Sequence, residues 1–255
     1  MAVVELERRG SIALVTLNRP EARNAISPEV SQTMATILDE IEADPTLRTV
    51  VITGRGDVFC AGADLKVVAQ GKANDIASGK GGFAGIATRD FPKPIIAAVQ
   101  GPALAGGFEI VLSCDLVVAS DTAKFGIPEA KRGLMAAAGG LIRLPKRVPL
   151  AIALEMAMTG DPIEADRALA LGLVNRVVPA DQVVAAAIAM AESIGENSPI
   201  AVRNSRQLVR EAGELSEAEG WKRTFELMMP VFESGDSIEG AMAFAEKRAP
   251  IWKSS

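Results

Sequence analysis

The chain has 255 residues, of which 49% are hydrophobic and 23% are charged, so it is expected to fold as one large α/β domain or as a core with a smaller appendage. Its formal net charge of −5 argues against broad binding to nucleic acid. Because the chain has no histidine, a Ser-His-Asp triad and a His-rich metal site are excluded, and acid/base chemistry falls to carboxylates, lysines or cysteines.

The first half of the chain alternates strand-like and helix-like patterns. The β-prone run 12–17 is closed by the turn residues Asn18-Arg19-Pro20. Ser27-Pro28 resembles an N-cap with proline at the first helical position, and apolar residues recur at helical spacing up to Asp44-Pro45. Further strands are predicted at 50–53, 94–99 and 116–119, and a buried helix at 108–113. Repeated strand-loop-helix units imply parallel pairing of the strands.

The remaining segments divide into a surface stretch and a helical region. Between Val67 and Arg89 the sequence is rich in Gly, Ala, Lys, Asp and Ser, which predicts a mobile surface segment. From about Leu150 the patterns are mostly helical. The predicted helices are 151–158, 163–171, 182–194, 200–211 and the amphipathic 237–248, which proline ends at position 250.

The cysteines and the distribution of apolar residues indicate the cellular compartment. Cys60 and Cys114 lack the spacing of a metal knuckle or a small disulfide scaffold, and we expect both to be buried thiols. The first nine residues mix charges with apolar residues and lack the apolar core of a secretory signal. No stretch reaches the roughly 18 uninterrupted apolar residues of a membrane span. We therefore expect a cytoplasmic protein without a membrane partner.

Two loops built from small residues follow predicted strands. Gly106-Gly107 stands just before a helix, and Ala61-Gly62-Ala63-Asp64 follows the strand at 50–53. Glycine lacks Cβ and the first N–H groups of a helix lack internal partners, so such loops can direct backbone N–H groups at a ligand. If the loops converge on one oxygen, an N–H from each could hold a developing oxyanion, and removing one such donor typically costs about 3 kcal/mol of transition-state stabilisation.

Two glutamates stand twenty positions apart and near these loops. Glu109 ends Gly106-Gly107-Phe108-Glu109, and Glu129 ends Phe125-Gly126-Ile127-Pro128-Glu129. Taken singly, a glutamate in a first helical turn is explained by the helix dipole, and a Gly-Gly pair by a tight turn. The joint order and spacing of all these motifs favour a functional site instead.

In this order the motifs resemble the crotonase (enoyl-CoA hydratase/isomerase) superfamily, and specifically its hydratases. The likeness covers nearly the whole chain. Besides the segments above, it includes Leu17-Asn18-Arg19-Pro20, Asn24-Ala25, Phe59-Cys60, Leu65-Lys66, Ala103-Leu104-Ala105, Thr159-Gly160, Gly172-Leu173-Val174, Val177-Val178-Pro179-Ala180 and Ala245-Glu246-Lys247-Arg248-Ala249-Pro250.

The resemblance implies an α/β fold in which a spiral of ββα units, residues 1–195, precedes a C-terminal helical trimerisation region, residues 196–255. It also implies a homotrimer or a dimer of trimers. The implied activity is the reversible, syn-type addition of water to a trans-2-enoyl-CoA, giving a 3-hydroxyacyl-CoA, as in fatty acid metabolism. No metal or separate cofactor is expected, because coenzyme A is part of the substrate.

The resemblance also assigns site residues. The oxyanion donors fall on the backbone N–H groups of Ala63 and Gly106, and Glu109 and Glu129 flank the water. Two carboxyl groups in different protonation states suit a reaction in which water loses a proton while Cα gains one. The sequence leaves open which glutamate takes which step. The expected substrate and coenzyme A contacts are Arg23, Ala25, Ala61, Gly62, Asp64, Leu65 and Lys66, with Phe244 and Lys247 reaching a neighbouring subunit's ligand.

Other functions stay open on these residues. Isomerases of the superfamily generally keep one acid/base carboxylate, whereas both positions are filled here, so the main rival is the dehydration of a specialised substrate such as carnitinyl-CoA. Two features bear on the acyl pocket: Met135-Ala136-Ala137-Ala138-Gly139-Gly140 replaces a Pro-Gly pair common before the Gly-Gly, and Phe108 adjoins Glu109. A non-catalytic acyl-CoA-binding scaffold is disfavoured by the intact glutamate pair, since buried carboxylates are costly. RNA binding lacks an aromatic or basic platform.

Overall fold

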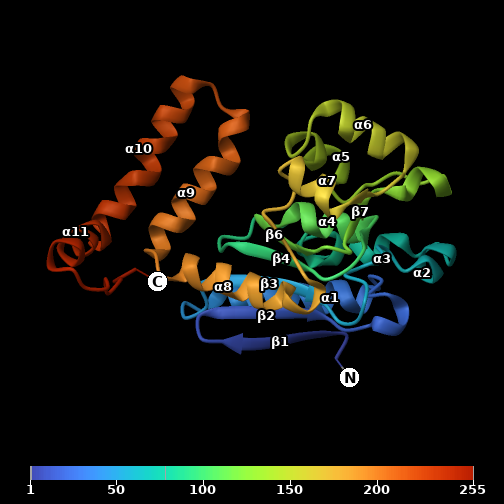
Figure 1. Cartoon of the computed structure of the whole chain (residues 1–255), viewed down its shortest axis with the longest axis horizontal. Coiled ribbons are helices and arrows are strands. Elements are labelled where there is room, and N and C mark those ends of the chain that lie inside the picture. Colours follow the sequence, from blue (N-terminus) through green and yellow to red (C-terminus); the bar gives the residue numbers. More distant parts are fainter. Residues whose placement is uncertain (1, 78, 255) are drawn as a thin grey trace.

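A twisted sheet of six strands forms the centre of the computed structural model, which describes residues 2–77 and 79–254 (Figure 1). The strand order is β1-β2-β3-β4-β6-β9. Only β1 and β2 pair antiparallel among these neighbours, and the others pair parallel. The bounds are β1 Val4–Arg9, β2 Ile12–Leu17, β3 Thr49–Gly54, β4 Ile95–Val99, β6 Leu116–Ser120 and β9 Arg176–Val178.

A second, smaller sheet of three short strands carries the glutamate-bearing segments. Its order is β5 (Ala103–Leu104), β7 (Lys124–Gly126) and β8 (Ile163–Glu164). The strand β5 runs directly into helix α4 (Gly106–Ser113), and β7 runs directly into the 3-10 helix η3 (Pro128–Arg132). Because β5 and β7 pair in parallel, the two segments leave the small sheet in the same direction.

Both faces of the large sheet are covered, as parallel sheets require. Helix α8 (Val183–Gly195) packs through Val183, Ala187 and Ala191 on one face. Helix α1 (Pro28–Ala43) contributes its apolar stripe to the larger core on the other face. Ser27 caps α1 by accepting a hydrogen bond from the backbone N–H of Val30. The helix and its cap therefore match the prediction from Ser27-Pro28.

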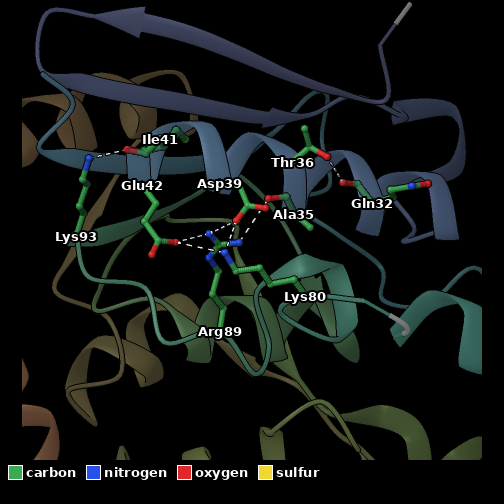
Figure 2. A network of polar contacts seen from close by, with 9 residues as sticks. All are labelled: Gln32, Ala35, Thr36, Asp39, Ile41, Glu42, Lys80, Arg89 and Lys93. Atoms are coloured by element: carbon green, nitrogen blue, oxygen red, sulfur yellow. Dashed lines mark hydrogen bonds and ion pairs between the residues drawn. The ribbon is translucent and has the colours of Figure 1, made fainter. Parts of the chain in front are cut away.

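A polar network joins the chain before β4 to the outer side of α1, as Figure 2 shows. The Arg89 side chain is 3% exposed and donates through Nη2 to Asp39 Oδ1 at 2.6 Å and to Glu42. Lys80 donates to the same Asp39 oxygen at 2.5 Å. At the end of α1, Lys93 donates to the backbone oxygens of Ile41 and Asp44, at 2.5 and 2.6 Å, and so satisfies carbonyl groups that lack helical partners.

The segment 67–89 differs from its prediction as a mobile surface stretch. It contains the helices α2 (Leu65–Ala69), α3 (Ala73–Ala77) and η2 (Phe83–Gly85), and its later part is buried at Ala84, Ile86 and Ala87. The hydroxyl of Ser31 on α1 donates to Ile76 O at 2.7 Å and accepts from Ala84 N at 3.2 Å. The prediction of a surface segment is therefore wrong for residues 84–87, where the chain packs against α1.

The C-terminal helices form an arm that projects from the core, on the side away from α2 and α3 (Figure 1). They are α9 (Pro199–Glu211), α10 (Glu217–Glu233) and α11 (Asp236–Glu246). The arm is tied to the core by Arg206, whose Nε donates to Asp115 Oδ2 at 2.8 Å. The division at residue 195 stays a prediction, although α8 belongs to the sheet and α9 to the arm.

The remaining helices, α5 (Gly140–Arg143), α6 (Leu150–Thr159) and α7 (Ala165–Ala170), lie near α4 and the small sheet (Figure 1). The helix predicted at 163–171 is wrong at its start, because Ile163 and Glu164 pair with β7 before α7 begins. The four predicted strands and their parallel pairing are confirmed. The strands β1, β5, β7 and β9 and helix α10 were not predicted. No helix in the described part of the chain is long and apolar enough to cross a membrane.

Candidate active site

The two loops of small residues meet in the structure. A Cβ atom on Gly62 would lie 3.0 Å from the Gly106 backbone nitrogen and 2.8 Å from the Ala105 Cβ, so only glycine allows this approach. Two parallel bridges, Cys60 to Ala103 and Ile26 to Ala63, hold the loop of Gly62 in place. The two loops therefore lie side by side, which is the arrangement that the conditional oxyanion prediction needs.

Two backbone N–H groups are free at this meeting point. Among the hydrogen bonds between residues 2–77 and 79–254, none is donated by the N–H of Ala63 or Gly106. Gly106 is the first residue of α4, where helical N–H groups lack internal partners. The residue before it, Ala105, has φ 53° and ψ −132°, a conformation that costs non-glycine residues about 1–3 kcal/mol and clusters at functional sites.

An aromatic ring covers Gly106. A Cβ on Gly106 would lie 2.4 Å from Phe83 Cζ, so the Phe83 ring rests against the glycine. Phe83 belongs to η2 and is half-buried. It was not singled out from the sequence, because no motif marks a residue whose importance comes from packing on a distant loop. Phe108, by contrast, is fully buried against Phe125, with ring centroids 5.6 Å apart, and stands behind the site.

Glu109 lies in the first turn of α4 with its carboxyl held by a backbone cradle. It is 3% exposed, and its Oε1 accepts hydrogen bonds from Ala138 N at 2.7 Å and Gly140 N at 2.8 Å. Burial raises the pKa of this carboxyl, while the two N–H groups and the charge of Arg143 act in the opposite direction. The unusual sequence 135–140 thus provides two backbone N–H donors. The sequence alone did not show that Glu109 is their acceptor.

Glu129 lies on η3 and has no comparable support. Its Oε2 is buried, and no residue in the described parts of the chain forms a hydrogen bond with it. Burial is the largest cause that raises the pKa of Glu129 to about 7, and the charge of Glu109 adds to the rise. The hydrogen bond from its own backbone N–H and the charge of Arg132 lower it. The structure therefore brings the two predicted glutamates into one electrostatic neighbourhood.

The remaining contact candidates divide between this neighbourhood and the arm. The segment of Arg23, Ala25, Ala61, Gly62, Asp64, Leu65 and Lys66 is continuous with the oxyanion loops, since Arg23 O accepts from Ala61 N at 3.1 Å. The side chains of Arg23 and Lys66 are exposed. Asp64 caps α2 by accepting a hydrogen bond from Lys66 N at 3.1 Å, so its carboxylate has a structural role at the start of the helix.

Arg19 holds this segment together and was not proposed from the sequence. Its Nη1 donates to Ala25 O at 2.7 Å, and its Nη2 donates to Asp64 Oδ2 at 3.2 Å. The Leu17-Asn18-Arg19-Pro20 motif was the available signal, but it gave no partner for the side chain. Arg19 therefore joins the two loop segments that carry the expected coenzyme A contacts.

Phe244 and Lys247 are not brought to the site of their own chain. Phe244 is 89% exposed on α11, and Lys247 follows the end of that helix in a left-handed conformation. Figure 1 shows α11 at the opposite end of the molecule from α2 and α3. A role for these residues therefore requires a second subunit.

Comparison with known proteins places this geometry in a family. The sequence model described as "Enoyl-CoA hydratase/isomerase" matches residues 7–255. A carnitinyl-CoA dehydratase from Proteus mirabilis is 43% identical over 256 residues, covering 98% of each chain. An enoyl-CoA hydratase structure from Mycobacterium marinum is 44% identical with a TM-score of 0.96, covering 100% of both chains. A carnitinyl-CoA hydratase structure from Mycobacterium avium is 45% identical with a TM-score of 0.78, covering 99% of both.

Proposed function

This chain belongs to the enoyl-CoA hydratase/isomerase family, and from this premise we propose that it is a lyase that adds water reversibly to a trans-2-enoyl-CoA. The observation that carries the proposal is the pair of shielded glutamates with unlike surroundings beside two free, converging N–H groups. The product is a 3-hydroxyacyl-CoA, and the reverse reaction is a dehydration.

The thioester carbonyl oxygen would lie between the N–H groups of Ala63 and Gly106. When a nucleophile attacks Cβ of the enoyl thioester, negative charge builds on this oxygen. Preorganised donors stabilise such charge without reorganising, and each donor is worth about 3–4 kcal/mol in related sites. The strained backbone at Ala105, directly before Gly106, supports this role, because such conformations cluster at functional sites.

The two glutamates would divide the proton transfers. Two N–H donors favour the ionised form of Glu109, which makes it the base that takes a proton from water as the oxygen attacks Cβ. Glu129, with a pKa near 7 and no donor on its buried oxygen, would be protonated and give its proton to Cα. After one turnover Glu109 holds the proton and Glu129 is ionised, so exchange with solvent restores the starting state.

Coenzyme A would bind along the segments joined by Arg19. Arg23 and Lys66 are exposed cations that can meet phosphates, and Ala25, Ala61, Gly62, Asp64 and Leu65 offer backbone surface. Because coenzyme A is part of the substrate, the proposed chemistry needs no separate cofactor. Cys60 and Cys114 are buried free thiols, which fits the reducing conditions of the cytoplasm.

We further propose that the arm assembles the chain into a homotrimer or a dimer of trimers. Its helices expose large apolar side chains, which in such number mark a protein interface. They include Trp221 at 61%, Phe225 at 57%, Met229 at 50%, Phe232 at 53% and Ile238 at 62%. Assembly would also allow Phe244 and Lys247 to reach a neighbouring subunit's ligand. Sedimentation equilibrium tests this, and a monomer at micromolar concentration would reject it.

Dehydration of a carnitinyl-CoA-like substrate is the second candidate. It is favoured by two relatives, the carnitinyl-CoA dehydratase from Proteus mirabilis at 43% identity and the carnitinyl-CoA hydratase from Mycobacterium avium at 45%. The chemistry is the same reaction in reverse, so the two candidates differ in the acyl group and not in the roles of the glutamates. An isomerase is less well supported, because a double-bond shift requires no second carboxyl group positioned for water.

The test is the loss of enoyl-thioester absorbance when the protein meets crotonyl-CoA and a longer trans-2-enoyl-CoA, with carnitinyl-CoA assayed for dehydration. Glu109→Gln and Glu129→Gln should each reduce kcat by about 10²–10⁴-fold, the usual size of general acid or base catalysis. Turnover of carnitinyl-CoA alone would select the second candidate. Full activity in either variant would reject the two-glutamate mechanism, and absence of thioester binding would reject the assignment as a whole.

A further inference from the structure

Arg143 is a half-buried cation that the proposed mechanism does not use. Its guanidinium donates from Nη1 to Ser113 Oγ at 3.2 Å and to Ala138 O at 3.3 Å, and from Nη2 to Ala87 O at 2.6 Å. No carboxylate in the described parts of the chain lies within ion-pair distance of it. A charged group held only by neutral oxygens is costly to bury, so its placement calls for a reason.

The guanidinium stands directly behind the cradle of Glu109. Ala138 accepts from Arg143 through its carbonyl oxygen and donates to Glu109 Oε1 through its N–H, at 2.7 Å. At Gly139 a Cβ atom would lie 2.1 Å from Arg143 Nη1, so the loop passes against the guanidinium. Ser113, a second partner of Arg143, donates to the backbone oxygen of Glu109 at 2.8 Å. Both the cradle and the helical turn of Glu109 are therefore fixed to one side chain.

The third bond reaches the opposite side of the site. Ala87 follows η2, and its N–H donates to Phe83 O at 3.1 Å. Phe83 is the residue whose ring rests against Gly106, one of the two proposed oxyanion donors. Arg143 thus links the segment that covers the oxyanion site to the loop that holds the proposed base. These segments are more than 50 residues apart in the chain.

We propose that Arg143 is a positioning residue of the hydration site, which fixes the 136–140 loop around Glu109, faces that carboxylate with a half-buried positive charge, and anchors the segment that carries Phe83. The proposal rests on the proposed function, because it takes Glu109 as the base. It concerns a residue that contacts no reacting atom and acts through Ala138, Ser113 and Ala87.

The electrostatic part involves a small set of charged groups. Arg143 lowers the pKa of Glu109, against the larger effect of burial. Glu129 faces Glu109 from η3 and is itself influenced by Arg132. Arg147, Arg210 and the Cys114 thiol face Arg143. Removal of the guanidinium therefore leaves Glu109 with its backbone donors and with the nearby Glu129. The pKa of Glu109 should then rise.

A substrate-free titration tests this part. The carboxyl carbon of Glu109 is followed by NMR in protein labelled with 13C-glutamate, and its signal is assigned with Glu109→Gln. In Arg143→Met we expect the Glu109 transition to move to higher pH, because the positive charge that lowers its pKa is gone. Arg143→Lys, which keeps the charge, should leave it near the wild-type position. Arg147→Met is the matched control, since Arg147 is a nearby arginine, half-buried like Arg143, that donates to Cys114 O at 2.8 Å and not to the loop.

Kinetics test the positioning part. Arg143→Met should move the acid limb of the kcat/KM profile to higher pH. Arg143→Lys should keep the limb but lower kcat by about tenfold with little change in KM, because one ammonium cannot hold three oxygens in the fork geometry. A folded Arg143→Met whose Glu109 titrates as in the wild type would overturn the proposal. If Arg143→Met does not fold, an unchanged kcat in Arg143→Lys would overturn it. A wild-type protein without hydratase activity would reject the proposed function instead, while the NMR titration would still decide the link between Arg143 and Glu109.

Discussion

The segment around Glu109 and the segment around Glu129 solve the same problem in different ways. Both place a glutamate carboxyl, buried in Glu109 and half-buried in Glu129, in a helical turn that follows a short strand. The first surrounds one carboxyl oxygen with two backbone N–H groups, at 2.7 and 2.8 Å. The second leaves a buried oxygen without a partner in the described parts of the chain. The difference teaches that burial alone does not assign an acid/base role, since burial raises the pKa of both groups.

The backbone donors separate the two roles. A hydrogen bond to a carboxylate favours its charged form, whereas burial without one favours the neutral form. Two nearby carboxyl groups also discourage simultaneous ionisation, so the pair holds one proton over a range of pH. We expect that shared proton on Glu129, which has one buried oxygen without a partner and a pKa raised to about 7. The contrast between the segments therefore predicts the direction of proton flow in the proposed reaction.

Among changes that keep both glutamates, the largest effect should come from an added methyl group within the Glu109 cradle. In Gly140→Ala the new Cβ would lie 3.0 Å from Glu109 Oε1 and 3.1 Å from its Cγ, so the carboxyl must move or lose a donor. Misplacing a catalytic group by about 1 Å can cost 10²-fold, and we expect kcat/KM for the enoyl thioester to fall by about that factor. Gly213→Ala is the matched control, because nothing lies within 4 Å of a Cβ there. Equal activity of the two variants would mean that the cradle does not position the base.

The pH dependence tests the contrast without a mutation. Glu129 must be protonated to act as the acid in hydration, and its pKa is about 7. The kcat/KM profile should therefore fall above about pH 7, approaching tenfold per pH unit. Dehydration should show the same basic limb, because both directions use a site that holds one proton between the two carboxyl groups. A profile that stays flat to pH 9 would remove Glu129 from the acid role. The residual activity of Glu129→Gln should lack this limb.

The sequence predicted the parts of this site that depend on local pattern. Gly106-Gly107 before a helix and the two glutamates could be found because glycine spacing and order along the chain carry that information. The strands at β2, β3, β4 and β6 were predicted for the same reason, since continuous apolar runs indicate buried parallel strands. Short strands such as β5 and β7 contain two or three residues, too few for a period, and were missed.

The features that depend on distant packing could not be predicted. The donors to Glu109 come from Ala138 and Gly140, about 30 residues further along the chain, through backbone atoms that any residue type except proline provides. Phe83 and Arg143 become part of the site only when η2 folds onto α4. Glu129 Oε2 lacks a hydrogen-bond partner in the described residues, and no residue pattern can predict a missing contact. The proposed division of roles between the glutamates therefore rests on contacts that no sequence pattern records.

The smallest effect concerns the free energy of unfolding, which the partnerless buried Oε2 of Glu129 should lower. The pKa of Glu129 rises from its ordinary 4.5 to about 7 in the folded state. A carboxyl whose folded pKa is raised stabilises the fold fully below pH 4.5 and loses that contribution as the pH rises through 7. Glu129→Gln removes the charge, so at pH 8 the variant should be more stable than the wild type by about 1–2 kcal/mol, after allowing for partial exposure. The measurement is urea unfolding at pH 5 and pH 8, at one protein concentration because assembly would shift the midpoint.

The advantage should shrink at pH 5, where the wild-type carboxyl is already mostly protonated in the folded state. Glu109→Gln, which exchanges an ionised acceptor of two N–H bonds for a neutral one, should show no such gain. A Glu129→Gln protein that is less stable than the wild type at pH 8 would show that Glu129 has a stabilising partner, and the contrast between the two segments would then fail at its energetic basis.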